Sequence, residues 1–119
     1  MHVTDPDVII STTDSVPGYE VKKYVGVAWA SSARTLNAVS EIGAVLRGLG
    51  GGDLPEFRKL LNEGRQGALH GMAQNAHARG ANAVIGARLE AAEIVQGTLE
   101  IYAYGTAVVV EKKRQPLGK

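Results

Sequence analysis

Two histidines spaced seven residues apart are the side chains of this sequence best suited by type to bind a metal. His70 and His77 fall in a stretch that predicts a helix, and this spacing places both on one helix face. Two helical turns separate them by about 10.5 Å along the axis, whereas zinc–nitrogen bonds measure about 2.0–2.1 Å. One ion therefore cannot bind both within a chain, and there is no cysteine to hold a soft metal. His70 and His77 remain candidate ligands for a divalent metal shared between subunits, where symmetry brings copies of one histidine together.

The glycine-rich stretch RGLGGGD, from Arg47 to Asp53, raises phosphate binding as a second chemistry. A phosphate loop of the nucleotide hydrolases follows a strand and ends in Gly-Lys and then Ser or Thr. This stretch instead follows a predicted helix and ends in Asp53, which would repel a phosphate. Asp53 is also a suitable cap for a second helix, and Pro55 suits that helix's first turn. We interpret the glycines as the end of one helix and a corner before the next.

Hydrolytic catalysis has no recognisable motif in this chain. The sequence contains no Gly-x-Ser-x-Gly pattern, and no serine has a local signature that links it to either histidine. The positions of the acidic residues in the predicted elements are typical of solvated faces. The hydroxyls of STT, residues 11–13, suit either a small-molecule pocket or a turn, and we favour the turn. We therefore assign no catalytic residue.

The composition is that of a soluble globular protein without a strong charge. The chain has 119 residues and a net charge of +1, with 45% hydrophobic, 21% charged and 5% aromatic residues. Such a balance does not favour nucleic-acid binding, and no apolar run approaches the ~20 residues of a membrane span. The absence of cysteine suits a reducing compartment, so we expect a cytoplasmic protein. Four basic residues near the end predict a solvated tail: Lys112, Lys113, Arg114 and Lys119.

Hydrophobic periodicity predicts the order β-β-α-α-β-β. Strands are expected over residues 8–11 and 19–30, with a turn at Pro17-Gly18 between them. A first helix, capped by Ser32 or Thr35, is expected over residues 35–49, and a second from Pro55 to Gly80. Two strands over residues 82–94 and 98–112, joined at Gln96-Gly97, complete the chain. Three glycines inside the second helix indicate close packing on a neighbour: Gly64, Gly67 and Gly71. The class is α/β of the α+β type, with a mixed or antiparallel sheet.

Several motifs together resemble the YbjQ-like family, small bacterial and archaeal proteins often described as heavy-metal-binding. They are RGANAVIG at residues 79–86, YGTAVVV at 104–110, STT at 11–13, Gly26 and the Gly51-Gly52 pair. The resemblance spans residues 8–112 and implies one YbjQ-like domain over residues 1–112, followed by a basic tail over 113–119. It also implies a ring-like homopentamer.

The chain departs from the family pattern at three places. It has Ala30-Ser31 for Gly-Glu, Asp53 for Arg, and Phe57 for Tyr. The expected function is a non-enzymatic oligomeric binding or scaffold protein that contacts copies of itself and neither nucleic acid nor membrane. The alternative is an enzyme or small-ligand-binding protein whose site forms between subunits, with Arg47, His70 and His77 as candidates.

Overall fold

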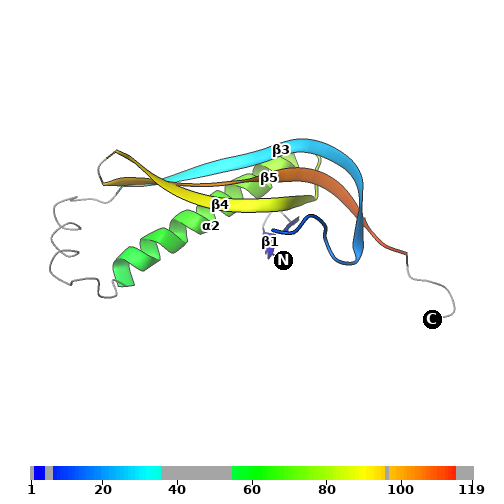
Figure 1. Ribbon diagram of the computed structural model, residues 1–119, viewed down its shortest axis with the longest axis horizontal. Coiled ribbons are helices and arrows are strands. Elements are labelled where there is room, and N and C mark those ends of the chain that lie inside the picture. The colour runs from blue at the N-terminus through cyan, green and yellow to red at the C-terminus, as the bar shows by residue number, and fades with distance from the viewer. Residues whose placement is uncertain (1, 5–6, 36–54, 96, 115–119) are drawn as a thin grey trace.

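The protein forms one mixed β-sheet with a long helix along one of its faces (Figure 1). The computed structural model describes residues 2–4, 7–35, 55–95 and 97–114. The elements are β1 (His2–Thr4), β2 (Val8–Ile10), β3 (Tyr19–Thr35), α2 (Pro55–Ala78), β4 (Ala83–Val95) and β5 (Thr98–Lys112). The strand order is β1-β2-β4-β5-β3, in which β2 and β4 are parallel and the other neighbours antiparallel. The α+β class and the mixed sheet are confirmed, whereas nothing in the sequence pattern predicts β1.

Strand β3 is longer than its pattern predicts, and this corrects the start of the first predicted helix. Ser32 lies opposite Ile101, and Thr35 lies opposite Thr98, so neither residue caps a helix. Continuous pairing with β5 outweighs the local capping preference of Ser and Thr. The rest of that predicted helix and the glycine-rich stretch up to Asp53 fall on residues 36–54, outside the described residues. One helix, α2, is thus described where the sequence predicts two.

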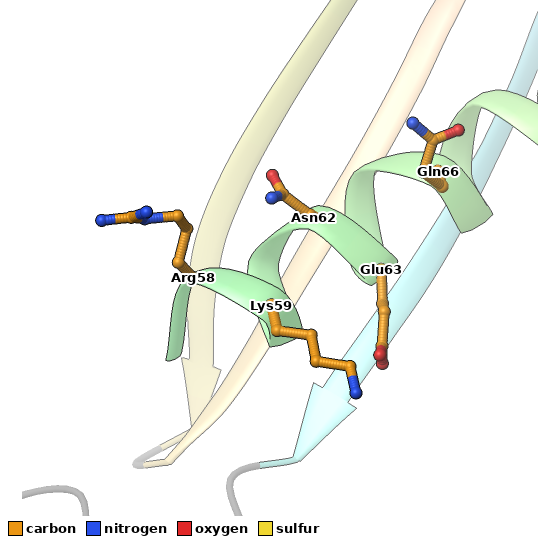
Figure 2. Close-up of a pocket in the computed structure, with 5 residues that line it drawn as sticks. All are labelled: Arg58, Lys59, Asn62, Glu63 and Gln66. Carbon is orange, nitrogen blue, oxygen red and sulfur yellow. The ribbon is translucent and has the colours of Figure 1, made fainter. Parts of the chain in front are cut away.

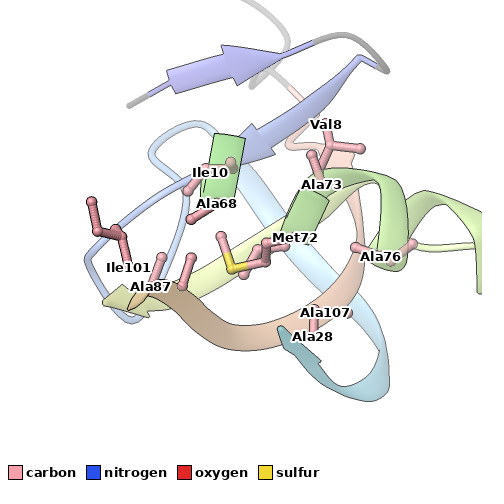
Figure 3. Packing of buried hydrophobic residues seen from close by; sticks show 13 residues of the cluster. Val8, Ile10, Ala28, Ala68, Met72, Ala73, Ala76, Ala87, Ile101 and Ala107 are labelled. Carbon is pink, nitrogen blue, oxygen red and sulfur yellow. The ribbon is translucent and has the colours of Figure 1, made fainter. Parts of the chain in front are cut away.

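The apolar stripe of α2 packs on β3 and β5 and forms the main core with the sheet. Ala68, Met72 and Ala76 of the helix are fully buried there (Figure 3). A Cβ on Gly71 would stand only 2.8 Å from the Cβ of Ala30 on β3. The predicted close packing of a helix glycine is therefore confirmed at Gly71, where any side chain would push the helix off the strand.

Two of the predicted chain reversals form as their glycines indicate. The helix ends in a Schellman motif, in which the amides of Gly80 and Ala81 donate to the carbonyls of His77 and Ala76, each at 3.0 Å. Gly80 has the left-handed φ of +88° that this motif requires. The amide of Tyr19 likewise donates to Val16 across Pro17-Gly18 at 3.0 Å, which closes the predicted turn.

Asn82, which follows this helix end, forms hydrogen bonds with the last strand, β5. The side-chain amide of Asn82 donates to the carbonyl oxygen of Val110 at 2.9 Å, and its carbonyl oxygen accepts from the Val110 amide at 2.8 Å. The Asn82 main-chain amide also donates to the Val108 carbonyl at 3.1 Å. One asparagine side chain thus acts as an additional strand residue beside β5, because its amide carries a donor and an acceptor like a peptide group.

The STT segment supports an irregularity in β4. The carbonyls of Thr13 and Ser11 accept from the amides of Gly86 and Ala87 at 2.8 and 3.0 Å. The register between β4 and β5 shifts there, between Ile85 and Arg88. The Ser11 and Thr13 hydroxyl oxygens lie 2.6 Å apart, and the Thr13 hydroxyl donates to the Ser15 carbonyl at 2.6 Å. Because these hydroxyls bond within the segment, the structure supports the turn over a pocket.

Within the described residues, the sheet is covered on both faces only in the half that contains this irregularity. There the face opposite α2 carries a second buried cluster: Val16, Ala83, Ile85, Val108 and Val110. Beyond it, β3, β4 and β5 extend together toward the β4–β5 turn (Figure 1). We call this extension the arm, comprising residues 27–35, 88–95 and 98–106. The arm brings the described side chains of three strands together on a face away from the helix.

Candidate functional site

The face of the arm opposite α2 is formed by cross-strand rows that the strand register defines. Trp29, Tyr104 and Arg88 form one row, and Ser31, Tyr102 and Glu90 form the next. Residues directly opposite on antiparallel strands place their side chains on the same face. We call the following set the outer arm face: Val27, Trp29, Ser31, Arg88, Glu90, Ala92, Glu100, Tyr102 and Tyr104.

Aromatic rings dominate the outer arm face and remain accessible. The Trp29 side chain is 63% exposed, that of Val27 is 62% exposed and that of Tyr104 is 37% exposed. The rings of Tyr102 and Tyr104 stack with their centroids 6.2 Å apart. Three of the six aromatic residues of the chain gather here. Contiguous exposed aromatic surface is typical of sites that bind a partner or ligand.

Carboxylates border these rings. The Tyr104 hydroxyl donates to Oε2 of Glu90 at 2.6 Å, and this hydrogen bond raises the pKa of Tyr104 above its usual value, which keeps the phenol protonated. Arg88, the cation of the face, donates through Nη1 to the carbonyls of Thr12 and Ala87 at 2.9 and 2.8 Å. Its guanidinium is thus bound to the main chain, while Glu90 is exposed beside the aromatic rings. The face combines aromatic rings with negative charge.

A shallow groove of about 360 Å³ crosses the outer arm face. Trp29, Ser31, Tyr102, Tyr104 and Glu100 line it, together with Ala30, Ala92 and Ala103. Its volume is near the lower limit of ligand pockets, about 300–1,000 Å³. Aromatic faces and carboxylates together suit a positively charged group, because cations are attracted both to the ring face and to the acid. The Tyr104 hydroxyl lies beside the Glu90 carboxylate, but its raised pKa keeps it protonated, so this pair is not an activated nucleophile.

The predicted metal ligands lie elsewhere, on the exposed side of α2. His70 and His77 are both exposed, two helical turns apart. Among the described residues, no group of three or more His, Cys, Asp or Glu side chains could hold a metal ion. Arg47, the third candidate for a site between subunits, falls outside the described residues. The structure therefore brings none of the predicted site residues together within the described chain.

A second groove, of about 530 Å³, runs along the first turns of α2 (Figure 2). Arg58, Lys59, Asn62, Glu63 and Gln66 line it, and all five belong to one helix. Asn62 already accepts a hydrogen bond from Arg65 Nη1 at 2.9 Å. Because no second described element contributes a converging group, this groove defines no chemistry.

Sequence reasoning did not single out the outer arm face. The alternation along residues 98–110 indicates two semi-apolar faces, which predicts either a doubly covered sheet or a subunit interface. The register that sets Trp29 beside Tyr104 depends on pairing between residues 75 positions apart, which no local pattern specifies. The available signal was the recurrence of aromatic residues at period two, Tyr102 and Tyr104, opposite a strand that carries the single tryptophan.

Fold and site define a small α+β protein with a mixed sheet, a single described helix and an arm whose aromatic face no described element covers. The chain belongs to the YbjQ family, whose sequence model is described as "Putative heavy-metal-binding" and matches residues 8–111. The resemblance found in the motifs is thereby confirmed. Within the described residues, no helix is both long enough and apolar enough to cross a membrane.

Curated relatives cover almost the whole chain. A UPF0145 protein of Halalkalibacterium halodurans is 45% identical over 105 residues, which cover 88% of this chain and 99% of the relative. A UPF0145 protein of Clostridioides difficile is 41% identical over 93% of this chain and 99% of the relative. The crystal structure of a protein of unknown function from Pediococcus pentosaceus, of the DUF74 family, matches with a TM-score of 0.53. The match covers 87% of this chain and 98% of the Pediococcus pentosaceus chain. Its sequence identity is 19%, so it supports the fold alone.

Proposed function

We propose that this protein is a non-enzymatic binding module that assembles into a ring-like homopentamer, in which each outer arm face contacts a neighbouring subunit. The exposed aromatic surface of that face is the observation that carries the proposal. Protein interfaces are enriched in Trp and Tyr, which contribute a large share of binding energy when they are desolvated. In a closed ring every copy uses the same pair of different surfaces, so one such face per chain is sufficient. The number five comes from the family resemblance.

Replacing Trp29 tests this assembly. We expect native mass spectrometry of the wild type to give a pentamer, and Trp29→Ala to shift the distribution toward smaller species at the same concentration. The reason is that a central interface tryptophan commonly contributes 2 kcal/mol or more per contact, about a thirtyfold change in affinity or greater.

A matched control lies on the same strand. Tyr24 is an aromatic residue of β3, 69% exposed, outside the outer arm face. Tyr24→Ala should leave the mass distribution unchanged. A monomeric wild type would rule out the proposal, and so would an intact Trp29→Ala pentamer.

The second candidate function is divalent-metal binding between subunits by His70 or His77. Its support is the exposure of both histidines on α2 together with the description of the family. Isothermal titration of the assembled protein with zinc, copper and nickel tests it, because neutral imidazoles bind all three ions. We expect His70→Ala or His77→Ala to reduce the affinity at least tenfold, as loss of a ligand should. Absence of heat with all three metals in the wild type would contradict it.

An enzyme with a site between subunits stays the alternative to both. Arg47, His70 and His77 would be its candidate residues, and the described chain offers no arrangement that selects a reaction.

A further inference from the structure

A basic segment lies at the end of the sheet that is opposite the β4–β5 turn. Lys112, Lys113 and Arg114 follow one another at the end of β5, and all three side chains are exposed. The Lys113 amide donates to the Gly18 carbonyl at 2.8 Å, which fixes the segment beside the start of β3. Glu20 forms its ion pair with Lys22 at 2.9 Å, and Lys22 lowers the pKa of Glu20, to which the charge of Lys113 adds a smaller contribution. We call residues 112–114 the basic end.

The outer arm face has the complementary character. Glu100 lines the groove beside the aromatic rings, and Glu90 accepts the hydrogen bond of the Tyr104 hydroxyl. These two carboxylates face one cation of the set, Arg88, whose guanidinium donates to main-chain carbonyls. Lysine and arginine side chains bind such surfaces in two ways, by ion pairing with the carboxylates and by stacking on the indole or phenol faces. Within the described residues, the basic end is the one run of three consecutive exposed basic side chains, and it matches the face in sign and in side-chain length.

A chain cannot bring its own basic end to its own outer arm face. Ten residues of extended strand separate Tyr102 from Lys112, which is about 33 Å at 3.3 Å per residue. The basic end therefore cannot reach the groove of its own chain, whereas the basic end of another copy can.

We infer that the basic end of one copy docks on the outer arm face of the next, with Lys112 and Arg114 placed against the rings and carboxylates of that face. These two side chains point to the same side of an extended segment, and Lys113 between them adds positive charge. This inference rests on the proposed function and names the partner surface of that same site. The contact joins two different surfaces on opposite ends of the sheet, so it repeats head to tail and closes when the rotation per copy permits a ring. The groove, too small for a folded element, suits a short extended segment that contributes alternate side chains.

Charge reversal on the full-length chain tests this contact. One variant combines Lys112→Glu, Lys113→Glu and Arg114→Glu, and a second combines Glu90→Lys with Glu100→Lys. We expect each variant alone to weaken self-association at least tenfold by native mass spectrometry and light scattering, because like charges then meet across the contact. An equimolar mixture of the two variants should associate again, since each then supplies the surface that the other has lost. Only unlike variants attract, so the mixture should give alternating dimers and other even-numbered species rather than a closed pentamer.

A third variant controls for net charge. Lys59→Glu with Arg65→Glu alters a comparable number of charges on exposed positions of α2, away from both surfaces, and should leave association unchanged. If the basic-end variant assembles like the wild type while Trp29→Ala does not, the inference is wrong and the proposed function stands, with another surface covering the face. If the mixture fails to associate although both variants show wild-type circular dichroism, the inference is wrong as well. A wild type that is monomeric overturns both.

Discussion

Gly105→Ala should lower the free energy of unfolding by about 3 kcal/mol, at the upper end of what overpacking in a core costs. A Cβ at this position would stand 2.6 Å from Cγ1 of Val84, 3.0 Å from the carbonyl oxygen of Ile85 and 3.1 Å from Cα of Ala87. The last two atoms belong to the main chain of β4 at its register shift, which STT holds in place, so they cannot rotate away. For a domain of this size the expected loss corresponds to a fall in melting temperature of roughly 10 °C. Circular dichroism during thermal and urea unfolding measures both quantities.

Whether Gly105→Ala destabilises or stabilises the protein distinguishes the steric contact at this position from the intrinsic conformational preference of glycine. Glycine in a strand interior is less favourable than alanine by roughly 0.5–1 kcal/mol, so conformational entropy alone predicts that Gly105→Ala stabilises the protein. Gly18→Ala is the control, because Gly18 has a φ of +81° and no atom within 4 Å of an added Cβ. Backbone strain alone should cost that variant about 1–2 kcal/mol. A Gly105→Ala variant as stable as the wild type would show that β4 yields to the new methyl group.

Features with a local chemical cause were predictable from the sequence. The Gly80 helix end and the Pro17-Gly18 turn depend on residues within a few positions of one another, and each formed as predicted. Pairing of Val95 with Thr98 likewise confirms the Gln96-Gly97 connection between the last two strands. Residues that form their own hydrogen-bonded reversal carry the needed information in their side chains and backbone freedom.

Features that depend on distant pairing were not predictable. Ser32 and Thr35 are good helix caps, yet both lie in β3, because their partners Ile101 and Thr98 are supplied by β5. The outer arm face has the same origin, since Trp29, Glu90 and Tyr104 meet only through the register of three strands. For His70 and His77, the local pattern was sufficient to predict their positions on the helix but not a binding partner. Their spacing correctly placed two helical turns between them on exposed positions of α2, but it identifies no partner across an interface.

Asn82→Asp should cost about 1–3 kcal/mol at pH 7, although it changes a single atom type. The wild-type side chain donates through Nδ2 to the Val110 carbonyl and accepts through Oδ1 from the Val110 amide. A carboxylate keeps the acceptor but places a second oxygen against the carbonyl oxygen at about 2.9 Å, the distance that the donor now occupies. The native state then loses one hydrogen bond and gains a repulsive contact. Chemical unfolding of both proteins under the same conditions measures the difference.

The pH dependence of this loss identifies its cause. Repulsion from the Val110 carbonyl raises the folded-state pKa of the introduced carboxyl above its unfolded value of about 4. The penalty is therefore fully present at pH values above that raised folded-state pKa, and it declines as the pH falls toward the unfolded value, where a protonated carboxyl donates as the amide did. The stability difference from the wild type should be smaller at pH 3 than at pH 7. Asn62→Asp is the matched control, because Asn62 accepts from Arg65 on the exposed side of α2, so a carboxylate there should be neutral or slightly stabilising. An Asn82→Asp deficit that is equal at both pH values would contradict the proposed bonding.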